Sequence, residues 1–192
     1  MMQQPTKPAN VSDEVWERLL HATPQEARHL IREGLYDAPT SGLCPGFAQA
    51  NLIVLPKEQA YDFLLFAQRN PKPCPLLEVT DVGERMTQLC ATDCDIATDF
   101  PRYRIYEHGE LVAEVDNVAD WWRDDLVSFV IGCSFSFESE LIEAGIEMRH
   151  NTQGRNVSMY LTDVDCVPAG SMSGKMVMSM RPLPPDQVVK AV

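Results

Sequence analysis

The sequence predicts an α/β fold for this chain of 192 residues. The main observation is a strand–helix–strand pattern. Residues 51–55 (NLIVL) are apolar after Asn51, residues 57–70 repeat apolar side chains on one helical face, and residues 76–80 (LLEVT) form a second, largely apolar segment. Apolar strands joined by a helix are typical of a βαβ unit in a sheet covered on both faces. The length fits one domain, or one domain with a small insert.

Two amphipathic helices are expected before this unit. The first covers about residues 12–21, and the second begins at Thr23, where Glu26 completes a capping box, and ends at Gly34. Residues 38–51 then form a loop rich in glycine and proline, which contains Ser41 and ends at Asn51. The loop matches neither the phosphate-loop pattern nor the dinucleotide fingerprint. It is either a loop that approaches a ligand through its backbone or an ordinary structural turn.

The second half of the chain is expected to contain a hairpin, a helix and two strands. The hairpin covers residues 103–115 and turns at His108-Gly109. The helix runs from about residue 118 to 145, because the apolar residues between Leu126 and Leu141 recur at helical spacing. Strands follow at residues 157–161 and 175–180. The second of these strands places Met176, Met178 and Met180 on one face, where they are expected to fill the core.

The composition excludes several classes of function. Sixteen basic and 28 acidic residues give a net charge of −12, which repels nucleic acid and anionic membranes, although an arginine cluster could still bind an anionic substrate. No apolar run reaches the roughly 18 residues of a membrane span. Residues 1–10 lack the apolar core of a secretory signal, so a cytoplasmic location is expected. The oligomeric state stays open, and a homo-oligomer is compatible with the sequence.

The six cysteines are expected to be reduced thiols. Cys90 and Cys94 form the only close pair, and the other cysteines and the histidines are distant from it in sequence. A structural zinc site needs further ligands at short spacing, so no metal site is predicted, and no cofactor is expected.

A bend at Gly132-Cys133-Ser134, followed by Glu138, interrupts the apolar residues of the predicted helix. Glycine, thiol, hydroxyl and carboxylate groups at one break indicate that this segment lines a binding or catalytic site. The alternative is a kinked core helix with a buried cysteine, since free cysteine is often buried. Glu138, Asp124 and Asp125 adjoin apolar sequence and are the candidate acids and bases, and Cys133 is a candidate nucleophile if a base lies near it.

Arginines near predicted loops are the candidates for binding an acidic ligand, because guanidinium groups bind carboxylates through two parallel hydrogen bonds. Arg155, beside Asn156 and directly before a strand, has the most site-like position. Arg123 is a second candidate or the partner of a local ion pair with its acidic neighbours, and Arg102 is a third. His150 is a further acid–base candidate without supporting pattern.

Several long, collinear segments resemble the hydro-lyase family related to D-glutamate cyclase. They include PTSGLCPGFAQANLIVLP, AYDFLLFAQRNPKPCPLLEVT, TDFPRYRIYEHGEL, WRDDLVSFVIGCSFSFE, GRNVSMY and MVMSMRPLP, and the resemblance extends from about residue 26 to 192. It implies a three-layer αβα core with a mixed sheet and a smaller two-layer α+β part. The expected division is residues 1–98 in the core, 99–150 in the smaller part, and 151–192 returning to the core.

The resemblance also implies a dehydration in which D-glutamate closes to 5-oxo-D-proline. Arg155, with Arg123 or Arg102, would hold the two carboxylates of this small acidic substrate. Asp124 or Asp125 would act as the base and Glu138 as the acid, and backbone N–H groups near Cys133 or Ser41 would bind the oxyanion. Family members usually continue past residue 192, so a fragment or a truncated relative is expected. The alternative function is a non-catalytic module that binds an acidic amino acid.

Overall fold

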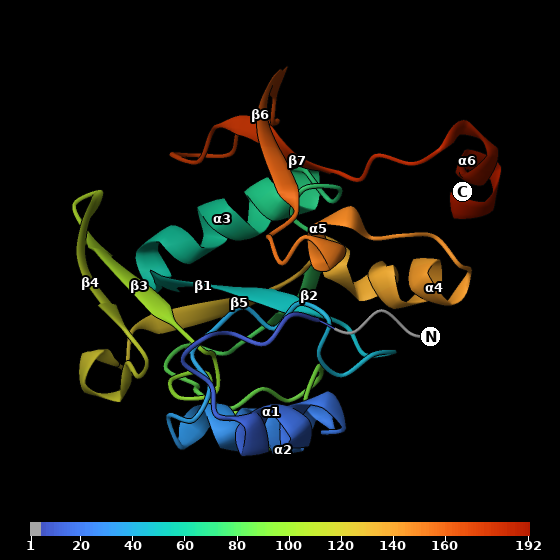
Figure 1. Ribbon diagram of the computed structural model, residues 1–192. Helices are drawn as coiled ribbons and strands as arrows, with labels where there is room; N and C mark the ends of the chain where they lie inside the picture. Colours follow the sequence, from blue (N-terminus) through green and yellow to red (C-terminus); the bar gives the residue numbers. More distant parts are fainter. Residues whose placement is uncertain (1–4) are drawn as a thin grey trace.

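A three-stranded sheet in the order β1–β5–β2 lies at the centre of the computed structural model, which describes residues 5–192 (Figure 1). The strands are β1 (Ala50–Pro56), β2 (Leu76–Val79) and β5 (Leu126–Gly132). Both ladders are antiparallel, and Phe129 in β5 lies opposite Ile53 on one side and Val79 on the other. The mixture of helices and strands confirms the predicted α/β class. The two strands of the predicted strand–helix–strand unit, β1 and β2, run parallel to one another, but they are not neighbours, because β5 lies between them.

The assignment of β5 also corrects the helix predicted over residues 118–145. Positions 127–131 of β5 are all buried, including Ser128. A strand buried on both faces shows no alternation, so its apolar run also fits a helical period. The β-branched and aromatic side chains of LVSFVIG favour the strand. Within residues 118–145, helical structure is limited to one short turn at residues 119–121 and to the turns that follow the bend.

Helix α3 (Lys57–Arg69) covers one face of the sheet, as the sequence predicts. Phe63 and Ala67 pack against Val127, Phe129 and Ile131 of β5. The rings of Phe63 and Phe129 meet edge to face with centroids 4.8 Å apart, a geometry that aromatic pairs prefer. This contact belongs to the apolar cluster between α3 and the sheet.

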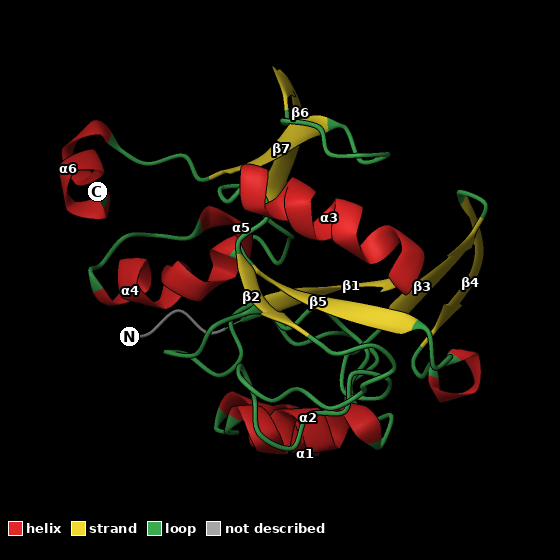
Figure 2. Cartoon of the chain, turned by 180° about the vertical axis from the view of Figure 1, so that it is seen from behind, coloured by secondary structure: helices red, strands yellow, loops and turns green. Residues whose placement is uncertain are grey.

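Helices α1 (Asp13–Leu20) and α2 (Pro24–Arg32) lie on the opposite side of the sheet, and loops separate them from it (Figure 2). They form a second apolar cluster that includes Leu19 and Leu30. The capping box at Thr23 and Glu26 is present, as predicted. The order α3, sheet, α1 and α2 gives the core three layers.

Two buried carboxylates organise the loops between the sheet and α2. Asp99 accepts two hydrogen bonds from the Arg32 guanidinium, at 2.8 and 2.7 Å. Glu78 in β2 accepts from the backbone N–H groups of residues 88, 89 and 90 and from the Cys90 thiol. Burial by itself raises the pKa of Glu78, but these hydrogen bonds together outweigh it and leave the pKa below its usual value. Burial and the bond to Glu78 raise the pKa of Cys90 to about 12.

Two antiparallel ribbons extend from this core. The hairpin of β3 (Tyr103–Glu107) and β4 (Glu110–Val115) turns at His108 and Gly109, both at positive φ, and confirms the prediction. The second ribbon pairs β6 (Ser158–Asp165) with β7 (Lys175–Met180). The short helical elements are η1 (Ala119–Trp121), η2 (Ser134–Phe137), α4 (Glu138–Glu143), α5 (Arg149–Thr152), η3 (Pro185–Gln187) and α6 (Val188–Ala191).

The methionines of β7 correct another expectation. Met178 and Met180 are about half exposed and do not fill a core, because the face of the ribbon that carries them is uncovered. The division of the chain into domains stays a prediction. Strand β5 belongs by sequence to the predicted smaller part, residues 99–150, but it is the middle strand of the central sheet. No helix within residues 5–192 is long and apolar enough to cross a membrane. All six cysteines are free thiols.

Candidate functional site

The carboxylate of Glu138, at the start of α4, is the centre of the candidate site. Its side chain is only 5% exposed, and it lies between two basic side chains that are each 10% exposed. Arg181 donates to it from Nε at 2.8 Å and also from Nη2. His150 Nε2 lies 3.1 Å from the carboxylate. A buried carboxylate is thus bonded to a fixed cation and to a group that can exchange protons.

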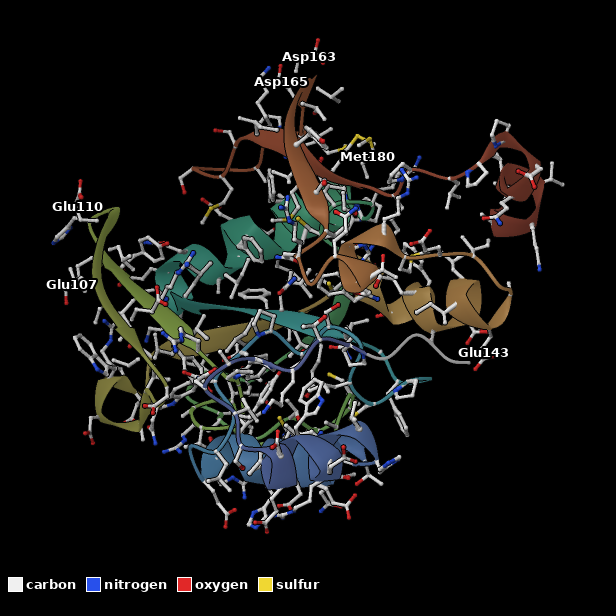
Figure 3. All side chains as sticks on the ribbon, in the orientation of Figure 1. Glu107, Glu110, Glu143, Asp163, Asp165 and Met180 are labelled. Atoms are coloured by element: carbon white, nitrogen blue, oxygen red, sulfur yellow. The ribbon has the colours of Figure 1, made fainter. Side chains whose placement is uncertain are left out.

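Three short elements bring these side chains together. Glu138 begins α4, His150 lies in α5, and Arg181 directly follows β7. The end of β7 lies beside α5, and Figure 3 shows Met180 at this inner end of the ribbon, whereas Asp163 and Asp165 lie at its outer tip. Residues far apart in the sequence therefore meet at one place because the β6–β7 ribbon returns the chain to the bend.

Two serines complete the hydrogen bonding around the guanidinium of Arg181. Ser134 Oγ and Ser179 Oγ lie 3.2 Å apart. Arg181 donates from Nη1 to Ser179 Oγ at 3.0 Å and from Nη2 to Ser134 Oγ at 3.1 Å. The guanidinium carbon also lies 4.9 Å from the centroid of the Phe137 ring. Arg181 is thus fully engaged and acts as a fixed positive charge.

The glycine- and proline-rich loop contacts the same bend. Gln49 donates its backbone N–H to Ser136 Oγ at 2.8 Å, and its carbonyl accepts from the backbone N–H of Cys133 at 3.0 Å. Cys133 is half-buried, so the bend is not sealed inside the core. Ser41 has a buried hydroxyl oxygen without a hydrogen-bond partner in the described part of the chain. Asn51 lies in β1 opposite Ile131 and is exposed.

Arg123, Asp124 and Asp125 lie at the other end of β5, which corrects the expectation that they share a pocket with the bend. Arg123 Nε pairs with Asp125 Oδ1 at 2.8 Å, and Asp124 is exposed, so the local ion pair named as the alternative is formed. The reason is the extended backbone: a seven-residue strand separates the two ends by roughly 20 Å at about 3.3 Å per residue. A helix would have brought them much closer.

The remaining predicted arginines lie apart from one another. Arg102 is engaged by Asp37 at 2.7 Å and by Glu114 at 3.3 Å near the β3–β4 hairpin. Arg155 and Asn156 follow α5 and are exposed. The backbone N–H of Arg155 donates to the carbonyl of His150 at 2.9 Å, so Arg155 adjoins the element that carries His150. Its guanidinium has no ion pair among residues 5–192.

The sequence patterns do not single out Arg181 or Ser179, and they offer His150 only as an unsupported acid–base candidate. Arg181 is one of several arginines near predicted loops, and His150 has no local pattern around it. The signal that would have identified them is the pairing of β6 with β7, which places the end of β7 beside the bend. That pairing depends on the tertiary fold.

Comparison with known proteins places this cluster in a recognised region. A family model described as D-glutamate cyclase matches residues 127–192, which include every residue of the cluster. A "Putative hydro-lyase" of Clostridium beijerinckii is 62% identical over 169 residues, 88% of this chain and 64% of that protein. The "Putative hydro-lyase YcsI" of Bacillus subtilis is 57% identical, covering 88% of this chain and 65% of that protein.

A "Putative hydro-lyase" of Psychrobacter arcticus is 55% identical over 174 residues, 91% of this chain and 66% of that protein. The chain thus spans slightly less than two thirds of the length of the curated relatives it matches. The identities are high over nearly all of the present chain, and the family model covers the segment from β5 to the last residue. By sequence, the chain is similar to these hydro-lyases over nearly all of its own length, and its last third matches the D-glutamate cyclase family model.

Proposed function

We propose that this protein is a hydro-lyase that closes a small acidic amino acid, with D-glutamate as the leading candidate, to its cyclic 5-oxoproline with loss of water. The names of the relatives and of the matching family model support this reaction class. The observation that carries the proposal is the buried Glu138 carboxylate, held by Arg181 and His150 within the matched region.

The reaction defines what the site must do. The amino nitrogen attacks the side-chain carboxyl carbon, a C–N bond forms, a C–O bond breaks, and the oxygen leaves as water. The ammonium group gives up two protons, and the leaving oxygen takes two. One group that accepts a proton and then returns it can therefore serve both halves of the reaction.

His150 fits the role of that group. With Nε2–H donating to Glu138, Nδ1 keeps a lone pair that can take a proton from the substrate ammonium and return it to the leaving oxygen. Glu138 orients the imidazole and stabilises its protonated form, as a carboxylate does in a hydrolytic triad. Arg181 supplies the positive charge that lets this carboxylate stay buried.

Arg155 is the proposed ligand of a substrate carboxylate. Arg181 has all its groups engaged within the cluster, whereas the guanidinium of Arg155 is exposed and adjoins α5. Holding the amine against the carboxyl carbon contributes several kcal/mol, because ring closure needs one fixed geometry. Because the backbone N–H groups of Gly132 and Cys133 already donate to the carbonyls of Pro75 and Gln49, the proposed donors to the developing oxyanion are the backbone N–H groups at the start of η2.

Incubation of the protein with D-glutamate, with 5-oxoproline followed by chromatography, tests the proposal. We expect His150→Ala to lower turnover by about 100-fold or more, the usual effect of removing a general base. His29→Ala is the matched control. His29 is an exposed histidine of α2, so this substitution is expected to leave turnover unchanged. Arg155→Ala is expected to raise KM more than it lowers kcat. Thermal stabilisation by D-glutamate without product would instead establish a binding module.

A further inference from the structure

The β6–β7 ribbon exposes apolar side chains on both of its faces. Leu161 is 72% exposed beside Val177 on one face, and Met178 is 53% exposed opposite Tyr160 on the other. A two-stranded ribbon without a covered face is marginally stable in water, and three or more strands or a packed helix are needed for stability. The ribbon therefore has apolar surface on both faces without a partner for it in the described chain.

The two ends of the ribbon are nevertheless anchored. In the segment between β6 and β7, the backbone N–H of Val167 donates to Asn70 Oδ1 at 2.8 Å, and that of Ser171 donates to Asp62 Oδ2 at 3.0 Å. At the other end, Ser179 is bonded to the candidate site. The ribbon is thus held in place above α3 while its faces stay open (Figures 1 and 2).

A second uncovered apolar surface lies along α3. A groove of about 670 Å³ runs between α3 and β2, with Tyr61, Leu64, Cys74 and Leu76 in its wall. Tyr61 is 70% exposed. Strand β2 is an edge of the sheet, so one row of its backbone N–H and C=O groups is free to pair with another strand. Both surfaces involve α3, since α3 lines the groove and anchors the ribbon.

We propose that the β6–β7 ribbon and the α3–β2 groove form one docking surface for a polypeptide segment equivalent to the part of the relatives that has no counterpart in this chain. This chain accounts for 64% of the Clostridium beijerinckii relative, so roughly a third of that protein is available to cover these surfaces. Strand addition to a free edge combined with burial of exposed apolar side chains is a recurring mode of peptide recognition.

A second copy of the chain is the less suitable occupant. Each copy carries a net charge of −12, so two copies repel one another. Outer-tip residues of the ribbon, such as Asp163, would also add acidic groups from both copies to such an interface. This proposal does not depend on the proposed reaction, because it concerns surfaces outside the Glu138 cluster.

The test uses the residues of the Clostridium beijerinckii relative that are unmatched here, produced as a separate polypeptide and titrated against the 192-residue chain. We expect saturable one-to-one binding by calorimetry. Leu161→Asp and Met178→Asp are each expected to weaken it at least tenfold. The matched control is Leu111→Asp, because Leu111 lies in the other ribbon and is 51% exposed, and this change leaves the affinity unaltered.

A fusion of the same segment to residue 192 covers the case in which the free segment does not fold. In this fusion we expect amide hydrogen exchange in residues 158–165 and 175–180 to slow at least tenfold relative to the chain alone. The proposal is overturned if neither form binds or protects the ribbon, or if Leu111→Asp weakens binding as much as Met178→Asp. It is also overturned if sedimentation shows a dimer of the chain that Met178→Asp dissociates and that the added segment does not.

Discussion

Replacing Arg181 by methionine removes the fixed cation from the Glu138 cluster while keeping an apolar stem of similar length. Glu138 is then left buried with His150 as its one basic neighbour, and Ser134 and Ser179 each lose a donor. Removing one partner of a buried ion pair costs about 3 to 5 kcal/mol, because the other charge stays desolvated without compensation. We expect the free energy of unfolding at pH 7 to fall by that amount.

Urea unfolding followed by circular dichroism measures the change. With a slope of about 2 kcal/mol per molar urea, the midpoint is expected to drop by roughly 1.5 to 2.5 M without a change in slope. Arg181→Lys keeps the charge but loses the two-pronged geometry, so a smaller loss is expected, and this variant keeps the test informative if Arg181→Met does not fold.

The double variant Glu138→Leu with Arg181→Met separates the ion pair from its surroundings. Removing both charges eliminates the uncompensated carboxylate, so the double variant is expected to be at least 2 kcal/mol more stable than the sum of the single changes predicts. Additive losses, or a loss below about 1 kcal/mol for Arg181→Met alone, would refute the reasoning that Glu138 is a buried charge dependent on Arg181.

Three further outcomes follow from other parts of the fold. The pKa of Glu78 is lower in the folded chain than its value near 4.5 in the unfolded chain, so the ionised carboxylate stabilises the fold above pH 4.5. This stabilisation is lost as the pH falls below 4.5. In urea titrations, the stability difference between the wild type and Glu78→Gln should therefore shrink between about pH 6 and 3. Arg123→Ala should leave both the urea midpoint and turnover nearly unchanged, because its ion pair is exposed and screened by solvent. Gly170→Ala should lower the melting temperature more than Gly109→Ala: both glycines have positive φ, but a methyl group at residue 170 would overlap the Asp62 carboxylate.

Features that depend on a few neighbouring residues could be predicted from the sequence. The capping box at Thr23 and Glu26 and the hairpin turn at His108-Gly109 are set by interactions within four residues, so their patterns are local. Helix α3 was predictable because its apolar residues recur at helical spacing and so form one buried face.

The position of β5 and the candidate site depend on contacts between distant parts of the chain. The burial of β5 on both faces hides the alternation that identifies a strand, and the misassignment placed Asp124 and Asp125 near the bend. Glu138 stays a predicted site residue, chosen as a carboxylate beside the bend. Its partner Arg181 could not be predicted, because only the return of the β6–β7 ribbon brings the two side chains together.

The position of β5 between β1 and β2 has a consequence for how the chain is assembled on the ribosome. The sheet pairs residues 50–56 and 76–79 with residues 126–132, so the strand that joins the other two is synthesised last. Until residue 132 has left the exit tunnel, β1 and β2 have no hydrogen-bonding neighbour, and their apolar side chains remain open to other nascent chains. Pairing over such distances slows folding, so chaperone dependence during translation should be governed by the arrival of β5.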